Sequence, residues 1–403
     1  RTLRAPLMTA SEAEPLRVPL AQAAERLRPT MERHGVAIVT GVASPEELAD
    51  LEQLFAQDLA DLVDESAAAT FGGQVQAAAA RARAPTARPH DWPLTSLAPL
   101  GAMERCGARG LPHGRFAWAA RQLPGVRRAY EVLHGTADLV SSCDNSFFAP
   151  PAHKKQASNR GLPHVDHNEH DPRFRDPEGR DLGSWEVYQG LLYVWGSTSE
   201  HSSATVVWPG SHQDVYRTIM ADAKVQRQGR QGRHFTLLDG MSPGEPTSRL
   251  REGWCAGARR APVPAGALLL WSSRTVHQGW RGGPRLAQPV CWEPTARRCE
   301  LALERKLRMS ALGLPSTHWA SLGLPHMLSD KTKPCDPTVA SVGKGGAVSL
   351  PLRSALRPCT LVDGVEVGHM WELLSGVAWM EPLPPSVRQR LEASVKASIR
   401  ALL

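Results

Sequence analysis

The sequence predicts an α+β fold with a mainly β core, flanked by helices on its N- and C-terminal sides. Between residues 131 and 300, short apolar runs are separated by turn residues rather than by helices. Glycine (34) and proline (33) are frequent across the 403 residues, which is typical of many turns and loops. Helical periodicity is clearest near the two ends. Together these observations favour a β-sandwich or barrel.

The first 130 residues are expected to pack on this core as an extension of helices and a strand. Residues 20–34 are predicted as a helix, followed by the apolar strand HGVAIVTGV. A second helix is expected to begin at Ser44, with Pro45 in the first turn and Glu47 completing a capping box. Residues 64–130 are rich in alanine, proline and arginine, and we interpret them as a helical or irregular excursion.

The predicted core covers residues 131–300, and residues 301–403 form a mixed, partly helical extension. The expected core strands are the runs LVSSCDNSFFAP, WEVYQGLLYVW, ATVVWPGSH, GALLLWSS and RLAQPVCW. Near the C-terminus, Ser386 is expected to cap an amphipathic helix with apolar residues Val387, Leu391, Val395 and Ile399 on one face. We expect the three segments to form one compact catalytic unit.

Composition and charge restrict the classes of protein that fit. The net charge is +7, but the basic residues are spread out, so a solvated surface is favoured over a nucleic-acid site. Seven scattered cysteines without a CxxC pair favour free thiols in a reducing, intracellular and cytoplasmic setting. Organelle targeting stays open because the chain starts at Arg1 rather than at a methionine. No apolar run approaches the about 18 residues that a membrane span needs.

The stretch LPHVDHNEH, residues 162–170, offers two candidate pairs of metal ligands. These pairs are His164 with Asp166, and His167 with Glu169. Residues two apart on a strand share a face, so either pair would present an imidazole and a carboxylate to one point. Val165 inside the first pair can point into a core, whereas Asn168 inside the second prefers water. The first pair is therefore favoured for a half-buried site.

A distant histidine and arginine complete a possible site. The run GALLLWSSRTVHQGW predicts a buried strand ending at His277, which lies 113 residues after His164 (277 − 164). Two histidines and one carboxylate form the facial triad of non-haem iron sites. Arg285 follows eight residues after His277 (285 − 277) and would place a forked cation at the start of the next strand, suited to a carboxylate. The alternatives are a core histidine and a surface arginine.

The order of these motifs resembles the phytanoyl-CoA dioxygenase-like family of Fe(II)/2-oxoglutarate-dependent oxygenases. The matching pieces cover residues 30–60 and 140–300 approximately: HGVAIVTGVASPEEL, LPHVDHN, YQGLLYVW, VVWPGSH, LLLWSSRTVHQGW and PRLAQPVCWEP. The segments 64–130 and 301–403 are not explained by these motifs.

The resemblance implies a double-stranded β-helix, a jelly-roll or cupin-like fold, with Fe(II) bound by His164, Asp166 and His277. It implies 2-oxoglutarate as cosubstrate, its far carboxylate held by Arg285, together with O2 and with ascorbate as an optional reductant. The implied reaction hydroxylates an unactivated C–H bond of a small-molecule or lipid-like substrate and yields succinate and CO2. A carboxylate at Asp166, rather than glycine or alanine, resembles the hydroxylases and not the halogenases.

Several residues close to the candidate metal ligands and Arg285 have expected roles as well. Gln189 and Tyr188 are expected to line the cosubstrate pocket, with core packing as an equal alternative for Tyr188. Ser273 is grouped with the cofactor-binding residues because it flanks the strand that leads to His277. The rigid PGSH turn favours a structural role for His212 over a catalytic one. His167 and His170 are expected either to hydrogen-bond to the ligands or to lie in a loop facing the substrate.

Three other functions compete with hydroxylation of a small molecule. A nucleobase- or protein-directed oxygenase would use the same metal site and a clustered basic groove. A non-catalytic binding protein would keep the fold without binding iron. A zinc site in the DHNEH cluster is disfavoured, because no cysteine or HExxH pattern accompanies it.

Overall fold

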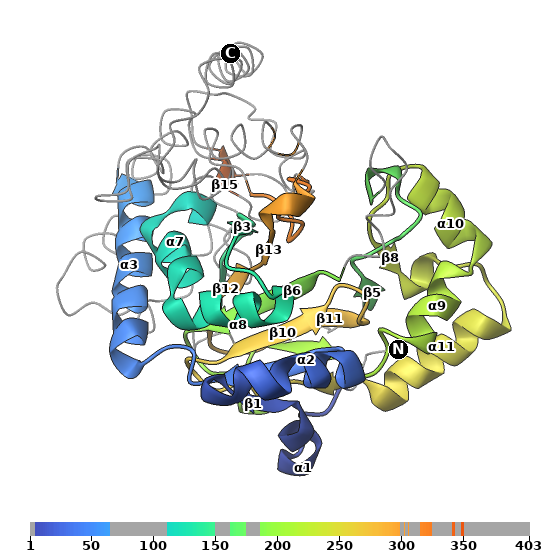
Figure 1. The fold of residues 1–403 in the computed structure, drawn as a ribbon, viewed down its shortest axis with the longest axis horizontal. Helices are drawn as coiled ribbons and strands as arrows, with labels where there is room; N and C mark the ends of the chain where they lie inside the picture. Colours follow the sequence, from blue (N-terminus) through green and yellow to red (C-terminus); the bar gives the residue numbers. More distant parts are fainter. Residues whose placement is uncertain are drawn as a thin grey trace, which may run out of the picture. The chain divides into compact units, whose positions relative to one another are not determined.

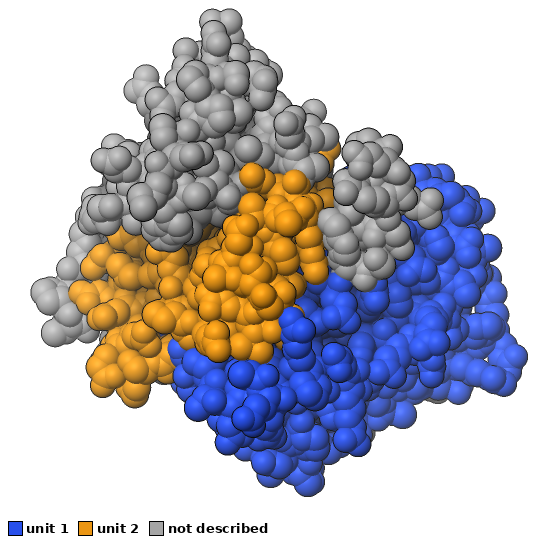
Figure 2. Space-filling view, viewed as in Figure 1, with its two compact units in different colours: residues 1–42, 154–283 blue, residues 43–153, 284–403 orange. Residues whose placement is uncertain are grey.

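The computed structural model describes residues 5–64, 111–149, 162–174, 186–298 and 315–324, with 302, 305, 341–342 and 348–349. The chain divides into two compact units, shown in two colours in Figure 2. Unit 1 comprises residues 1–42 and 154–283, and unit 2 comprises residues 43–153 and 284–403. This division differs from the three predicted segments, which stay a prediction. The predicted helix beginning at Ser386 lies outside the described residues.

Unit 1 begins with a helix–strand pair that confirms the predicted elements. After α1 (Ala10–Ala13) and β1 (Arg17–Pro19), helix α2 (Ala23–His34) leads into β2 (Val36–Thr40). The helix ends at Gly35, whose φ of 64° is a left-handed conformation that favours glycine. A Cβ atom here would also collide with the His212 ring and the Thr275 hydroxyl.

The strands of unit 1 form two sheets. In the first sheet the order is β1–β2–β10–β6, and in the second it is β8–β5–β11–β7–β9. The strands not yet given are β5 (His164–Val165), β6 (Tyr188–Tyr193), β7 (Ala204–Val207), β8 (Thr236–Leu237), β9 (Arg259–Arg260), β10 (Leu268–Ser272) and β11 (His277–Trp280). The consecutive strands β5, β6 and β7 lie alternately in the second, first and second sheet, and β9, β10 and β11 repeat this alternation.

Three helices pack beside the second sheet of unit 1. Helices α9 (Asp214–Met220), α10 (Ala223–Arg230) and α11 (Glu245–Gly257) gather near β5 and β8 in Figure 1. Apolar side chains of these helices form one buried cluster with Val165 of β5 and with Val276. Both valines are fully buried, and each such side chain contributes about 1.5–3 kcal/mol. The cluster thus anchors the two segments that carry the candidate ligands.

Unit 2 contains the predicted helix that begins after Ser44. In α3 (Pro45–Asp64), the Ser44 backbone N–H donates to Glu47 Oε2 at 2.8 Å and the Glu47 N–H donates to Ser44 Oγ at 3.2 Å. The predicted capping box is therefore confirmed. Unit 2 also contains helices α7 (Arg115–Gln122) and α8 (Pro124–His134). Its described strands include three antiparallel pairs: β3 (Leu139–Ser141) with β13 (Trp292–Pro294), β4 (Phe147–Ala149) with β12 (Arg285–Val290), and β14 (Ser341–Val342) with β15 (Val348–Ser349). The described fold is mixed, with sheets and helices in both units.

One predicted boundary is wrong. The strand expected to end at His277 is two strands, because β10 ends at Ser272 and His277 opens β11. The Thr275 backbone N–H donates to the Ser272 carbonyl at 2.8 Å, so the chain turns between them. The sequence SSRT contains neither glycine nor proline, the strongest turn signals, so the turn was not predicted.

Candidate metal centre

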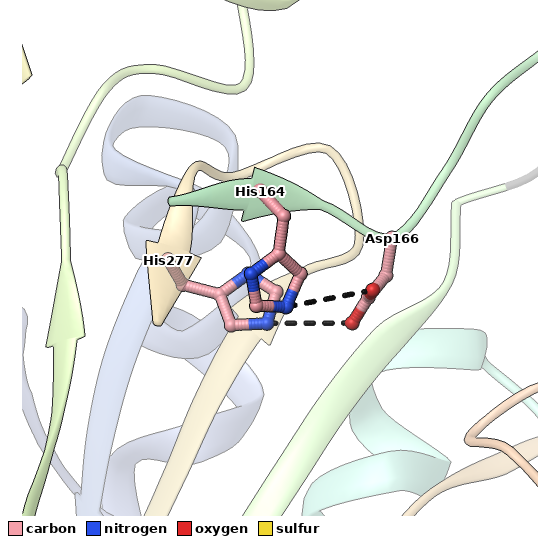
Figure 3. Close-up of side chains that lie close together, drawn as sticks. All are labelled: His164, Asp166 and His277. Atoms are coloured by element: carbon pink, nitrogen blue, oxygen red, sulfur yellow. Dashed lines mark ion pairs between the residues drawn. The ribbon is translucent and has the colours of Figure 1, made fainter. Parts of the chain in front are cut away.

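Three side chains converge at one end of the second sheet of unit 1. His164 lies on β5, Asp166 directly follows it, and His277 opens β11. Strands β5 and β11 are antiparallel, with His277 directly opposite His164, so the two imidazoles share a face. One ligand atom of each residue lies within 4.8 Å of the others. Figure 3 shows the three side chains pointing toward one another. Within the described part of the chain, this is the one group of three or more residues suited to a metal ion.

Strand alternation explains why both side chains of the HVD segment reach the same point. Val165 is fully buried in the core cluster, so its neighbours His164 and Asp166 point to the opposite side. The backbone N–H of Asp166 donates to the Ser273 carbonyl at 3.0 Å, which fixes the chain just beyond β5. Val276, directly before His277, belongs to the same buried cluster as Val165 and anchors His277 in the same way.

Backbone carbonyls orient both imidazoles. Nδ1 of His164 lies 2.7 Å from the Leu162 carbonyl oxygen, and Nδ1 of His277 lies 3.0 Å from the Thr275 carbonyl oxygen. A carbonyl can only accept a hydrogen bond, so each Nδ1 carries the proton. Each Nε2 is then left with a lone pair for a metal ion.

Both Nε2 atoms face the Asp166 carboxylate. Nε2 of His164 lies 3.6 Å from Oδ1 and Nε2 of His277 lies 3.3 Å from Oδ2 (dashed lines in Figure 3). The ring centroids of the two imidazoles are 4.3 Å apart. Two neutral imidazole nitrogens and a carboxylate oxygen are the donor set of non-haem Fe(II) sites, so the residues present fit this metal.

The site is more open on one side than on the other. The His277 side chain is 7% exposed, whereas those of His164 and Asp166 are 25% and 20% exposed. The Trp271 ring lies 5.2 Å from the His277 ring and closes the buried side. A ligand would therefore approach past His164 and Asp166.

Gln189 and Tyr188 face opposite sides of β6, although both were predicted to line the cosubstrate pocket. The Gln189 amide donates to Asp166 Oδ2 at 3.0 Å, which places it at the metal site. Tyr188, one residue earlier on the strand, donates its hydroxyl to the Glu186 carboxylate. Its contribution to cosubstrate binding stays a prediction.

Ser273 acts on the site through its backbone in this structure. Its carbonyl accepts the N–H of Asp166, and its own N–H donates to the Val187 carbonyl at 2.8 Å. Ser273 thereby ties the segment after β10 to the segment after β5. The predicted role of its side chain in cofactor binding stays a prediction.

Arg285 opens β12, the position predicted for it. Its side chain is buried, with the guanidinium carbon 4.7 Å from the centroid of the Phe147 ring, so the alternative of a surface arginine is wrong. Arg285 belongs to unit 2 and the three candidate ligands belong to unit 1. Its role toward 2-oxoglutarate stays a prediction.

The second candidate pair of the LPHVDHNEH stretch, His167 and Glu169, makes structural contacts, and the buried His167 ring lies edge-on to the Phe174 ring with centroids 4.9 Å apart. Asn168, expected to face water, is fully buried, so that expectation is wrong. Its amide nitrogen donates to the Val225 carbonyl at 3.1 Å and to the Thr236 hydroxyl at 3.2 Å. Nε2 of His170 lies 2.9 Å from the Met220 carbonyl oxygen, and the Glu169 carboxylate accepts the Tyr216 hydroxyl at 3.3 Å. These contacts anchor the loop to α9, α10 and β8.

The PGSH turn holds the chain that enters β11, and His212 within it has a structural contact. The Val276 N–H donates to the Ser211 hydroxyl at 2.8 Å, one residue before the ligand His277. Nε2 of His212 lies 3.1 Å from the Glu32 carbonyl oxygen. Burial lowers the pKa of His212, while the contact with the Glu32 carbonyl acts in the opposite direction.

The sequence did not indicate His234 as a neighbour of the site. Its carbonyl accepts the Asn168 N–H at 2.7 Å, just before β8, and β8 pairs with β5. Burial lowers the pKa of His234, while the negative charge of Asp166 acts in the opposite direction. An isolated histidine in the run GRHFT carries no spacing signal that would have identified it.

Comparisons with known proteins give distant likenesses. No family model matches the chain. The Ava biosynthesis cluster protein O of Aspergillus versicolor is 27% identical over 222 residues, which cover 54% of this chain and 65% of that protein. The chain thus matches less than two thirds of the length of this relative.

Two solved structures show a partial likeness in fold. The GlcNAc Inducible Gene 2 protein (GIG2, DUF1479) of Candida albicans has a TM-score of 0.49 at 10% identity, covering 96% of this chain and 86% of its own. HygX of Streptomyces hygroscopicus, solved with nickel and 2-oxoglutarate, has a TM-score of 0.37 at 14% identity, covering 67% and 87%. At these scores the likenesses carry no argument about function. In the described residues, no helix is both long and apolar enough to cross a membrane.

Proposed function

We propose that this chain is an Fe(II)- and 2-oxoglutarate-dependent dioxygenase that hydroxylates an unactivated C–H bond of a small-molecule or lipid-like substrate. The observation that supports it is the convergence of His164, Asp166 and His277, with both imidazole Nε2 atoms turned to the carboxylate. Such a facial triad leaves coordination positions free for a cosubstrate and oxygen. When bound, iron with 2-oxoglutarate and O2 supplies the oxidant that attacks the C–H bond, with succinate and CO2 as co-products.

Residues of the chain would hold the metal ion and exclude water from the buried side of the site. The carbonyls of Leu162 and Thr275 accept from Nδ1 of each histidine and so turn Nε2 toward the position of the metal ion. Trp271 and the cluster behind Val165 exclude water from the buried side. Substrate would enter on the more exposed side, at His164 and Asp166.

We propose a double-stranded β-helix of the phytanoyl-CoA dioxygenase-like type as the fold that carries the site. The support is the alternation of consecutive strands between the two sheets of unit 1, which is how a chain winds in a jelly roll. The pairing of β5 with β11 then places the HVD segment beside the distal histidine.

For the cosubstrate, we propose Arg285 as the partner of the far carboxylate of 2-oxoglutarate, and we retain Tyr188 and Ser273 as further candidates for cofactor binding. Arg285 is buried, and its guanidinium offers two parallel N–H donors to a carboxylate. Arg285→Ala should therefore weaken 2-oxoglutarate binding by at least 10-fold and leave Fe(II) binding unchanged. If 2-oxoglutarate binding is unchanged, another basic residue such as Arg281 has this role.

Two observations favour a small molecule over a nucleic acid as the substrate. The name of the Aspergillus versicolor relative places that protein in a biosynthesis cluster, which favours a small molecule here. Arg173, close to the site loop, is paired with Asp171, which does not favour a nucleic-acid groove. A nucleobase- or protein-directed oxygenase is the second candidate, and a non-catalytic binding protein the third.

The test is formation of succinate from 2-oxoglutarate in air, because succinate is a co-product of the proposed reaction. We expect succinate only when Fe(II) is added, and none from Asp166→Ala. Asp214→Ala, which removes an exposed carboxylate of α9, is the matched control and should retain the activity. Wild-type protein that binds no iron would support the non-catalytic alternative.

A further inference from the structure

The Asp166 carboxylate is held by a neighbour as well as facing the two histidines. Nε2 of Gln189 lies 3.0 Å from Oδ2 of Asp166. A carboxylate only accepts, so the amide nitrogen rather than the amide oxygen must face it. Oδ1 lies on the side of His164, at 3.6 Å from its Nε2. The two carboxylate oxygens therefore have different surroundings before any metal binds.

Gln189 is itself held rigidly. It lies on β6, all of whose residues are buried, and its side chain is 7% exposed. Its cross-strand partner on β10 is Trp271, whose ring packs against that of His277. Cross-strand partners project to the same face of a sheet. One pair of neighbouring residues therefore supports two of the three candidate ligands.

We propose that Gln189 is a positioning residue that fixes the orientation of the Asp166 carboxylate and favours metal binding through Oδ1 alone. This inference rests on the proposed function, since it concerns the same metal site. An oxygen that accepts an amide N–H has less electron density to give to a metal ion. Binding through one oxygen keeps one more coordination position free for the cosubstrate. The role differs from the direct cosubstrate contact that the sequence suggested for Gln189.

The test uses Co(II) alone as the probe, with calorimetry for affinity and visible absorption for the number of ligands. Gln189→Met removes the donor at nearly constant volume. Gln189→Asn keeps an amide but is one methylene too short to reach Asp166. Each should weaken Co(II) binding by about 10- to 100-fold, as loss of such partners does elsewhere, and should change the Co(II) absorption.

The matched control is Gln278→Met. Gln278 is also a buried glutamine, follows His277 directly, and has no hydrogen bond to a candidate ligand among the described residues. It should retain the affinity and spectrum of the wild type. Thermal unfolding of every variant without metal separates loss of binding from loss of fold.

The outcomes separate this inference from the proposed function. If both Gln189 variants bind Co(II) with wild-type affinity and absorption, the inference is wrong while the proposed function stands. If only 2-oxoglutarate binding to the Co(II) form weakens, Gln189 contacts the cosubstrate and does not position Asp166. If the wild type binds no Co(II), the proposed function and the inference both fail.

Discussion

At the scale of single residues, partly buried histidines link the stability of the protein to pH. His34, His212 and His234 have pKa values lowered from that of a free histidine, in each case mainly because burial disfavours the charged form. The unfolded chain therefore takes up protons at a higher pH than the folded chain does. The stability from these neutral histidines is fully present above about pH 6.5 and is lost as the pH falls toward the folded pKa values.

We predict that the free energy of unfolding falls between pH 7 and pH 5.5, and that His212→Gln reduces this fall. Glutamine can still donate to the Glu32 carbonyl, but it does not titrate. Urea unfolding at the two pH values measures the effect. His201→Gln, which changes an exposed histidine, is the control and should leave the pH dependence as it is. An identical slope for His212→Gln and the wild type would contradict the prediction.

At the scale of elements, the site depends on turns that hold short strands in register. Strand β5 has two residues, so its ligands are placed by contacts on either side, namely the Val165 core and the Ser273 carbonyl. Strand β11 is fixed through Ser211 of the PGSH turn, which accepts the N–H of Val276. This turn lies 65 residues earlier in the chain than the strand that it holds.

Ser211→Ala should destabilise the protein by about 1–3 kcal/mol, because it leaves the buried N–H of Val276 without its partner. It should also weaken metal binding, since the affected residue directly precedes His277. Chemical denaturation and Co(II) calorimetry measure the two effects. Ser248→Ala on the exposed face of α11 is the matched control. Equal stability of the two variants would show that the turn does not hold β11.

The elements also show what the sequence could reveal. His164 and Asp166 were identified because strand alternation and the apolar Val165 between them are local signals. The split between β10 and β11 was missed because the turn at Ser273 contains neither glycine nor proline. Burial of Asn168 was missed because its partners Val225 and Thr236 lie 57 and 68 residues away. Local patterns reveal faces and caps, whereas the partners of buried polar groups come from the tertiary fold.

At the scale of the whole molecule, a metal ion that binds only the folded chain must stabilise it. The three candidate ligands come from two segments of unit 1 that are 113 residues apart, so the unfolded chain offers no comparable site. Co(II) at about 100 times its dissociation constant should add about 2.7 kcal/mol of stability. Thermal unfolding should therefore shift upward with Co(II) for the wild type and not for His164→Ala. An equal shift for both proteins would indicate binding elsewhere.

The charge-transfer absorption of Fe(II) with 2-oxoglutarate, titrated in the absence of oxygen, tests the central claim most directly. We expect one iron per chain and a visible band that appears only when iron and 2-oxoglutarate are both present. The band should be absent from His164→Ala, Asp166→Ala and His277→Ala. A folded, iron-loaded wild-type protein that shows no band on addition of 2-oxoglutarate would show that the chain does not use this cosubstrate.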